Sequence, residues 1–214
     1  GPNGVGVAYA DSVPAQWNGS SGDHILWKTE IPVPGFNSPI VWEKKIFLSG
    51  ADRKIQVVYC VDADAGSILW QKEINNVPGS PEKKPENTAD TGLAAPTMAT
   101  DGFRVFVIFG TGDAAALDFE GNLIWAKNLG VPENHYGHSS SLITWRNLLL
   151  VQYDQNTGGR LIALDSKSGD LIYDRRREID ISWASPILVN TGTRDEIILN
   201  SSPAVVSHDP ATGR

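Results

Sequence analysis

The sequence predicts an all-β fold that is built from a four-stranded antiparallel unit repeated along the chain. A motif with the order small residue, Asp, Gly and aromatic residue recurs about every 45 to 57 residues, a spacing that fits one such unit. Short apolar runs joined by turn residues precede each copy, and no segment keeps the 3.6-residue period of a helix. Four-stranded units in series are typical of the blades of a β-propeller.

Each unit is expected to open with a hairpin whose first strand follows a step of small residues. The step usually ends in proline, which costs no ladder hydrogen bond at the first residue of a strand. In the first unit, Pro39 precedes the apolar runs 40–42 and 46–48, which turn residues separate. The steps of the later units are Ala94-Ala95-Pro96, Ser139-Ser140-Ser141 and Ala184-Ser185-Pro186.

The recurring motif predicts a tight turn between the third and fourth strands of each unit. Its Gly supplies the positive φ that such a turn needs, and its Asp can accept hydrogen bonds from the turn's own amides. The aromatic residue stands four positions after the Gly. The members of the four copies are Asp62, Gly66 and Trp70; Asp118, Gly121 and Trp125; Asp165, Gly169 and Tyr173; and Asp209 and Gly213, after which the sequence ends before a fourth aromatic residue.

These elements predict a single domain over residues 1–214 that contains about four blades. Residues 24–31, with Trp27, have the pattern of a fourth strand that no first three strands precede. We expect this segment to close the ring as the fourth strand of the last blade, because pairing the first and last strands removes exposed edges. The blades are expected at about residues 32–74, 91–130, 137–178 and 182–214.

Composition and charge narrow the classes of partner. The net charge of −7 argues against a nucleic-acid partner, because neutralising phosphates needs a basic surface. The basic run 175–177 is interpreted as a solvated strand edge. No apolar stretch approaches the roughly 20 residues of a membrane-spanning helix. Cys60 is the single cysteine, so no internal disulfide forms, and its apolar neighbours predict a buried strand residue.

Two connections are candidates for binding. In the stretch 133–141, His135 and His138 stand three residues apart, Tyr136 lies between them, and a serine follows His138. A metal site, a nucleophile, a ligand contact on one face and a structural loop are the alternatives, and the absence of a nearby third ligand or orienting acid favours the loop. The polar, proline-rich insertion 75–90 is interpreted as a mobile loop, with a partner-binding loop as the alternative.

The motif resembles the tryptophan-docking motif of the pyrroloquinoline-quinone (PQQ) repeat family, as the first and third copies show most fully. The opening segment 1–7, Trp17 and residues 25–28 also look like the start of exported bacterial members of that family. The resemblance implies that each tryptophan docks between neighbouring blades and that a full ring has eight blades. This chain then represents half of such a ring, and a closed ring of four blades is the alternative. The small residue of the motif is Cys60 in the first copy and Ala163 in the third.

Because the architecture is complete and no convincing catalytic set is found, we expect a non-catalytic scaffold that binds a protein or small-molecule partner through loops on one face, where His135, Tyr136 and His138 are the candidate contacts. The resemblance implies a periplasmic or otherwise extracytoplasmic location. The alternative is a fragment of a PQQ- and calcium-dependent quinoprotein dehydrogenase that oxidises alcohols or sugars. A sensor or adhesion domain is a third possibility. We find no catalytic set and no calcium ligand cluster, so PQQ and calcium rest on the resemblance alone. A homodimer is a further expectation, because two halves would complete a ring.

Overall fold

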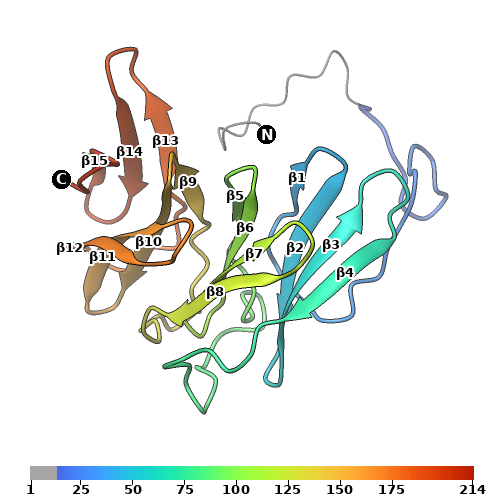
Figure 1. The fold of residues 1–214 in the computed structure, drawn as a ribbon, viewed down its shortest axis with the longest axis horizontal. Coiled ribbons are helices and arrows are strands. Elements are labelled where there is room, and N and C mark those ends of the chain that lie inside the picture. The colour runs from blue at the N-terminus through green and yellow to red at the C-terminus, as the bar shows by residue number, and fades with distance from the viewer. Residues whose placement is uncertain (1–13) are drawn as a thin grey trace.

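The computed structural model describes residues 14–214 as four antiparallel sheets that follow one another around an arc (Figure 1). The all-β prediction is confirmed, because no helix occurs in these residues. The segment 1–7, which contributed to the family resemblance, lies outside the described residues. Over the described range no helix is long and apolar enough to cross a membrane.

Each sheet is one blade, and its strands are paired in chain order. The first blade contains β1 (Ile40–Trp42), β2 (Lys45–Ala51), β3 (Gln56–Asp62) and β4 (Ile68–Glu73). The second contains β5 (Ala99–Thr100), β6 (Arg104–Ile108), β7 (Asp113–Asp118) and β8 (Leu123–Asn128). The third contains β9 (Ile143–Trp145), β10 (Leu148–Gln155), β11 (Gly158–Asp165) and β12 (Leu171–Arg177). The fourth has three strands, β13 (Ile187–Asn190), β14 (Asp195–Asn200) and β15 (Val205–His208).

Apolar cores lie between neighbouring blades and hold the arc together. Between the first and second blades, Phe47, Val58 and Cys60 pack against Val105 and Val107. Full burial of such a side chain contributes roughly 2 kcal/mol, so each interface is a substantial source of stability. Cys60 is buried as predicted, and this burial raises the pKa of its thiol to about 11. The thiol is therefore protonated at neutral pH and contributes as a small apolar side chain.

The aromatic residue of each motif packs onto the Gly of the next blade. Trp125 stands opposite Ala116 in the ladder of its own blade and covers Gly169 of the third blade. Its indole N–H donates to the Ser166 carbonyl at 3.1 Å. A β-carbon placed on Gly169 would lie 2.7 Å from the indole, and φ is +74° there, so both space and conformation require glycine.

This contact recurs along the arc. Trp70 packs on Gly121, Tyr173 packs on Gly213, and Trp27 packs on Gly66. The ring N–H or O–H donates in each case to a carbonyl of the same turn, at distances of 2.9 Å for Trp70 to Phe119, 2.9 Å for Tyr173 to Pro210 and 3.0 Å for Trp27 to Ala63. The tyrosine keeps the contact because its hydroxyl reaches an equivalent carbonyl.

The Asp of each motif organises the turn that carries the Gly. The carboxylate of Asp165 accepts hydrogen bonds from the amides of Lys167 and Ser168, both at 2.9 Å. These amides hold the pKa of Asp165 below its ordinary value. Asp62, Asp118 and Asp209 accept amide hydrogen bonds in the same way.

Residues 24–31 do not form the ring-closing strand that the sequence suggests. They have no strand pairing, and the fourth sheet ends at β15. The segment lies against the first blade, where Ile31 and Val33 pack with Tyr59. The fourth blade, which the prediction gave as its partner, is at the other end of the arc formed by residues 14–214 (Figure 1).

Candidate binding face

The antiparallel order of the strands gives the arc two faces. One carries the turns between first and second strands and between third and fourth strands. The other carries the hairpin loops between second and third strands, together with the connections 74–98, 129–142 and 178–186 that lead to the next blade. We call the second of these the connection face. Long connections on a rigid scaffold are where binding residues concentrate.

Three aromatic rings from two different connections meet on the connection face. His135 and Tyr136 lie between β8 and β9, and Trp183 lies between β12 and β13. The ring centroids are 4.2 Å apart for His135 and Tyr136, 5.1 Å for Tyr136 and Trp183, and 5.6 Å for His135 and Trp183. All three side chains are exposed. We call these residues the aromatic cluster.

Asn134 links the two connections that carry the aromatic cluster. Its side chain is buried, and its Oδ1 accepts hydrogen bonds from Trp183 Nε1 at 2.9 Å and from the Tyr136 amide at 3.2 Å. One buried amide therefore positions residues of both connections. Because this hydrogen bond holds the Trp183 ring, binding to that ring would cost a partner little conformational entropy.

The connection that carries His135 and Tyr136 is itself held at both sides. The Glu133 amide donates to Gln155 Oε1 at 3.1 Å, and the Asn156 amide donates to the Glu133 carbonyl at 2.8 Å. On the other side, the Thr88 amide donates to the Tyr136 carbonyl at 3.3 Å. The aromatic cluster thus belongs to a continuous loop surface that extends onto the insertion 75–90.

The insertion 75–90 is anchored to the blades at two points. Arg53, in the hairpin loop of the first blade, pairs with Glu86 at 3.1 Å and donates to the Lys84 carbonyl, also at 3.1 Å. Ser80 donates to the fully buried carboxylate of Asp113 at 2.7 Å. The insertion is therefore joined to the blades through its polar side chains, and its mobility stays a prediction.

His138 is separated from the aromatic cluster. It is 2% exposed, and its ring packs against Tyr153 with centroids 4.8 Å apart. Burial lowers the pKa of His138 to about 4, so the ring is neutral at pH 7. The expectation that His138 contacts a partner on the face does not fit this burial. In residues 14–214 no group of three His, Cys, Asp or Glu side chains is arranged to hold a metal ion.

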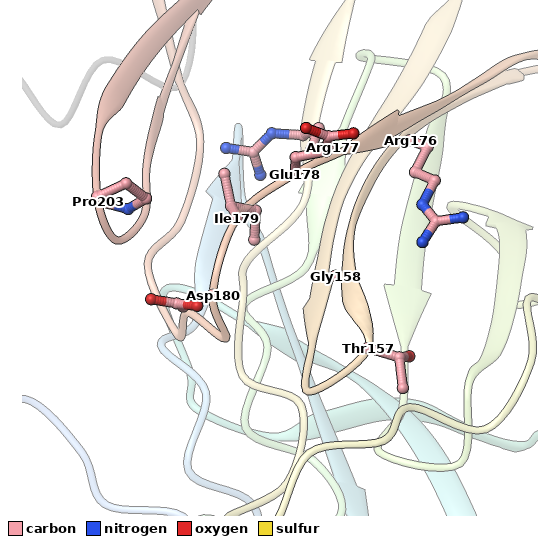
Figure 2. A pocket seen from close by; sticks show the side chains of 8 residues that line it. All are labelled: Thr157, Gly158, Arg176, Arg177, Glu178, Ile179, Asp180 and Pro203. Carbon is pink, nitrogen blue, oxygen red and sulfur yellow. The ribbon is translucent and has the colours of Figure 1, made fainter.

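The basic run 175–177 is not a uniformly solvated edge. Arg177 is buried and pairs with Asp154 at 2.5 Å, while Arg175 donates to the Thr212 carbonyl at 2.9 Å. Figure 2 shows Arg176 pointing away from Arg177, beside an open cavity of about 310 Å³ between the third and fourth blades. Because Asp154 already neutralises Arg177, this cavity offers no free buried cation for an anionic ligand. The cavity is lined by Thr157, Gly158, Arg176, Arg177, Glu178, Ile179, Asp180 and Pro203.

The first strands of the four blades offer no carboxylate ligand for calcium. The first strands of adjacent blades approach one another and lie toward the hollow of the arc (Figure 1), where an axial cofactor would sit. Their sequences, IVW, AT, ITW and ILVN, contain no carboxylate. Calcium needs six to eight oxygen ligands, several of them usually carboxylates.

Sequence reasoning missed Trp183. This residue stands directly before the step Ala184-Ser185-Pro186, in the position that Phe36, Leu93 and His138 take in the other units. That register could have marked it as a connection residue. The contact between the rings of Trp183 and Tyr136 could not be inferred, because the two residues are 47 positions apart and belong to different blades.

Comparisons with known proteins identify relatives of this architecture. The model of one protein family, PQQ_2, described as outer membrane protein assembly factor BamB, matches residues 15–144 and 55–214. BamB from Moraxella catarrhalis has a TM-score of 0.58 at 17% identity, over 88% of this chain and 53% of that chain. The quinohemoprotein alcohol dehydrogenase ADHIIG from Pseudomonas putida HK5 has a TM-score of 0.62 at 15% identity, over 88% and 34%. The computationally designed Ika4 protein has a TM-score of 0.52 at 10% identity, over 83% and 92%.

The comparison with curated proteins found no match. At these low identities the structural likeness shows the fold alone, a β-propeller architecture. The chain spans about half the length of the BamB structure and about a third of that of the dehydrogenase. The family model, however, covers nearly all of the described residues, and the resemblance to PQQ-repeat proteins is confirmed. The chain therefore belongs to the PQQ_2 family, whose model is that of the outer membrane protein assembly factor BamB.

Proposed function

We propose that this protein is a non-catalytic, exported scaffold that binds a protein partner through its connection face. The observation that carries the proposal is the aromatic cluster of His135, Tyr136 and Trp183, which is exposed and held in place by Asn134. Binding energy at protein interfaces is concentrated in a few residues, and Trp and Tyr are enriched among them. The exposed rings of Tyr136 and Trp183, on loops held by hydrogen bonds, have the chemistry of such an anchor.

A protein suits this cluster better than a small molecule. The cluster stands on the loops and does not line any of three cavities that residues 14–214 form along the blades. Small ligands are usually enclosed in concave pockets, whereas protein partners cover flat or convex surfaces. The net charge of −7 favours a partner whose contacting surface is neutral or basic.

The description of the family suggests where in the cell such a scaffold would act and what kind of partner it would bind. Its model is described as an outer membrane protein assembly factor. We extend that description to this chain as a proposal: the protein acts in the periplasm, where its partner belongs to the assembly of outer membrane proteins. The low identity to the BamB structure leaves the partner to be identified by experiment.

The test places a photo-crosslinking amino acid at position 135 and irradiates cells that express the protein with an export signal. We expect one dominant adduct with an envelope protein, to be identified by mass spectrometry. Adding Trp183→Ala should abolish that adduct by removing the anchor. Phe103→Ala is the matched control, because Phe103 is exposed in the turn between the first and second strands of its blade, on the opposite face.

Three outcomes count against the proposal. Absence of any adduct at position 135 would exclude a protein partner at this surface under the conditions tested. The same adduct from a crosslinker at position 103 would mean non-specific capture. An adduct that survives Trp183→Ala but is lost with Phe103→Ala would place the interface on the other face.

A further inference from the structure

We propose that the partner is recognised through arginine: a guanidinium group of the partner stacks on the aromatic cluster and lies among the carboxylates of the two connections that carry it. The inference rests on the proposed function and names the chemistry that the partner presents at this surface. Three features of the connection face carry it, namely the exposed rings, the charges around them and the cavity beside them.

The rings of the aromatic cluster expose their outer surfaces. Tyr136 is 49% exposed and Trp183 is 36% exposed. The ring centroids are 4.2 to 5.6 Å apart, so the rings touch one another and a ligand group stacks on the outside of the cluster rather than between them. The face of an aromatic ring attracts a cation within about 6 Å of its centre, and Arg is found there more often than Lys.

Other aromatic rings of this protein already hold a cation of the same chain. The guanidinium of Arg146 lies 4.4 Å from the centre of the Trp145 ring, and three further rings have a cation 5.6 to 5.8 Å away. Among residues 14–214 no Lys or Arg takes this position over Tyr136 or Trp183. The outer faces of the cluster are therefore open to a cation from another molecule.

The charged residues of the two connections that carry the cluster are all acidic. The segments 129–142 and 178–186 contain three carboxylates, Glu133, Glu178 and Asp180, and no Lys or Arg. All three side chains are exposed, and none of them pairs with a cation of residues 14–214. Charge complementarity therefore favours a cationic group on the partner.

The cavity of about 310 Å³ between the third and fourth blades continues this surface. Thr157 lines the cavity, and the amide of the residue before it, Asn156, donates to the Glu133 carbonyl at 2.8 Å. Asp180 also lines the cavity and stands three positions before Trp183. Both connections of the aromatic cluster thus run along the cavity, and the two belong to one surface.

The lining of this cavity has an excess of negative charge. Asp154 neutralises Arg177, which leaves one cation, Arg176, against the carboxylates of Glu178 and Asp180. Figure 2 shows Arg176 and Asp180 at opposite sides of the cavity, so the carboxylate is free for a ligand cation. The corresponding cavity between the first and second blades differs, because two lysines line it. The acidic character therefore belongs to the part of the connection face that carries the aromatic cluster.

Arginine fits this surface better than lysine. Its planar guanidinium stacks on an aromatic face, directs its N–H donors outward to carboxylates and is more weakly hydrated than an ammonium group. The cluster offers the ring face and the connections offer the carboxylates, so one arginine side chain uses both.

The first test is an NMR titration with the peptide Ac-Gly-Arg-Gly-Arg-Gly-amide, followed at the indole N–H of Trp183. This signal is the one that Trp183→Phe removes from those of the seven tryptophans. We expect a saturable shift with the arginine peptide. The matched peptide in which neutral citrulline replaces each arginine should give none, because it has the same shape without the charge.

Two variants separate the ring face from the charges. Tyr136→Leu should weaken binding of the arginine peptide about two- to fivefold, because one ring face is lost. The double variant Glu178→Gln with Asp180→Gln should weaken it about threefold. Glu73→Gln with Glu82→Gln is the matched control, because it removes two exposed carboxylates near the connection between the first and second blades, and binding should not change.

The second test uses the adduct that forms from position 135 in cells. Mass spectrometry of this adduct also locates the cross-linked segment of the partner, and we expect an arginine within a few residues of the cross-linked position. Replacing that arginine by glutamine in the partner should lower the yield of the adduct several-fold, and lysine at the same position should restore part of it.

The scaffold and the arginine contact fail in different ways. Absence of any adduct from position 135 counts against the scaffold itself. An adduct to a segment without arginine, or a yield that the glutamine substitution leaves unchanged, overturns the arginine contact and leaves the scaffold standing. Equal shifts with the arginine and citrulline peptides, or no shift with either, also overturn the arginine contact.

Discussion

Burial of His138 should make the stability of this protein depend on pH in a defined window. The folded-state pKa of His138 is lowered to about 4 by burial, whereas an exposed histidine in the unfolded chain titrates near 6.5. Between these values the unfolded chain binds a proton that the folded chain does not. The free energy of unfolding should therefore be at its full value above pH 6.5 and decrease as the pH falls toward 4.

The magnitude follows from the size of the pKa shift. A difference of about 2.5 pH units corresponds to about 3 kcal/mol, at about 1.4 kcal/mol per unit. Burial causes this shift: Tyr153 packs against the ring, and His138 Nε2 has no hydrogen-bond partner. A loss of this size is a large fraction of the 5–15 kcal/mol that stabilises a typical domain.

The assay is urea unfolding of the wild type and of His138→Phe at pH 7 and at pH 4.5. Phenylalanine preserves the ring packing and removes the titration, so we expect the loss between the two pH values to be about 2 to 3 kcal/mol smaller in the variant. His208, whose pKa burial also lowers, contributes with the same sign in both proteins and cancels from the difference. His135→Phe, on the exposed aromatic cluster, should leave the loss unchanged. An identical loss in wild type and His138→Phe would refute the reasoning.

Four further outcomes are expected. In chemical denaturation, Gly169→Ala should destabilise the protein by about 2 kcal/mol more than Gly192→Ala. Both glycines have positive φ, but only a side chain at position 169 would clash with Trp125. Equal effects would show that the Trp125 indole moves aside at little cost. Arg177→Met should cost about 3 to 5 kcal/mol, because it leaves Asp154 buried and unpaired. Arg160→Met, at a partly exposed pair with Asp174, should cost less than about 1 kcal/mol. Adding PQQ and calcium to the chain should give no saturable absorbance change; saturable binding would support the dehydrogenase alternative.

The fold was predictable because its signals are local. The turn between third and fourth strands needs an Asp and a Gly at fixed spacing, and the hairpins need turn residues between apolar runs. Each of these requirements acts within about ten residues and recurs four times, so it can be found in one sequence. Even the contact of Trp125 with Gly169, which joins two blades, follows from the repetition of a local unit.

The binding face was less predictable because its contacts are not repeated. His135 and His138 look equivalent in sequence, yet one lies in the aromatic cluster and the other is buried against Tyr153. What separates them is the direction that the connection takes over the hairpin loop, which Glu133 and Asn156 fix by a backbone hydrogen bond. Such a bond leaves no trace in side-chain identity.

Residues 24–31 show where local sequence signals stop being sufficient to predict the structure. Residues 24–31 carry a correct local pattern, and Trp27 takes the position that the pattern assigns to it. Pairing also needs a partner strand within reach, and that depends on how far the arc of blades extends rather than on the segment itself. Among residues 14–214 no strand pairs with this segment, so the local pattern is present without the pairing that it predicts.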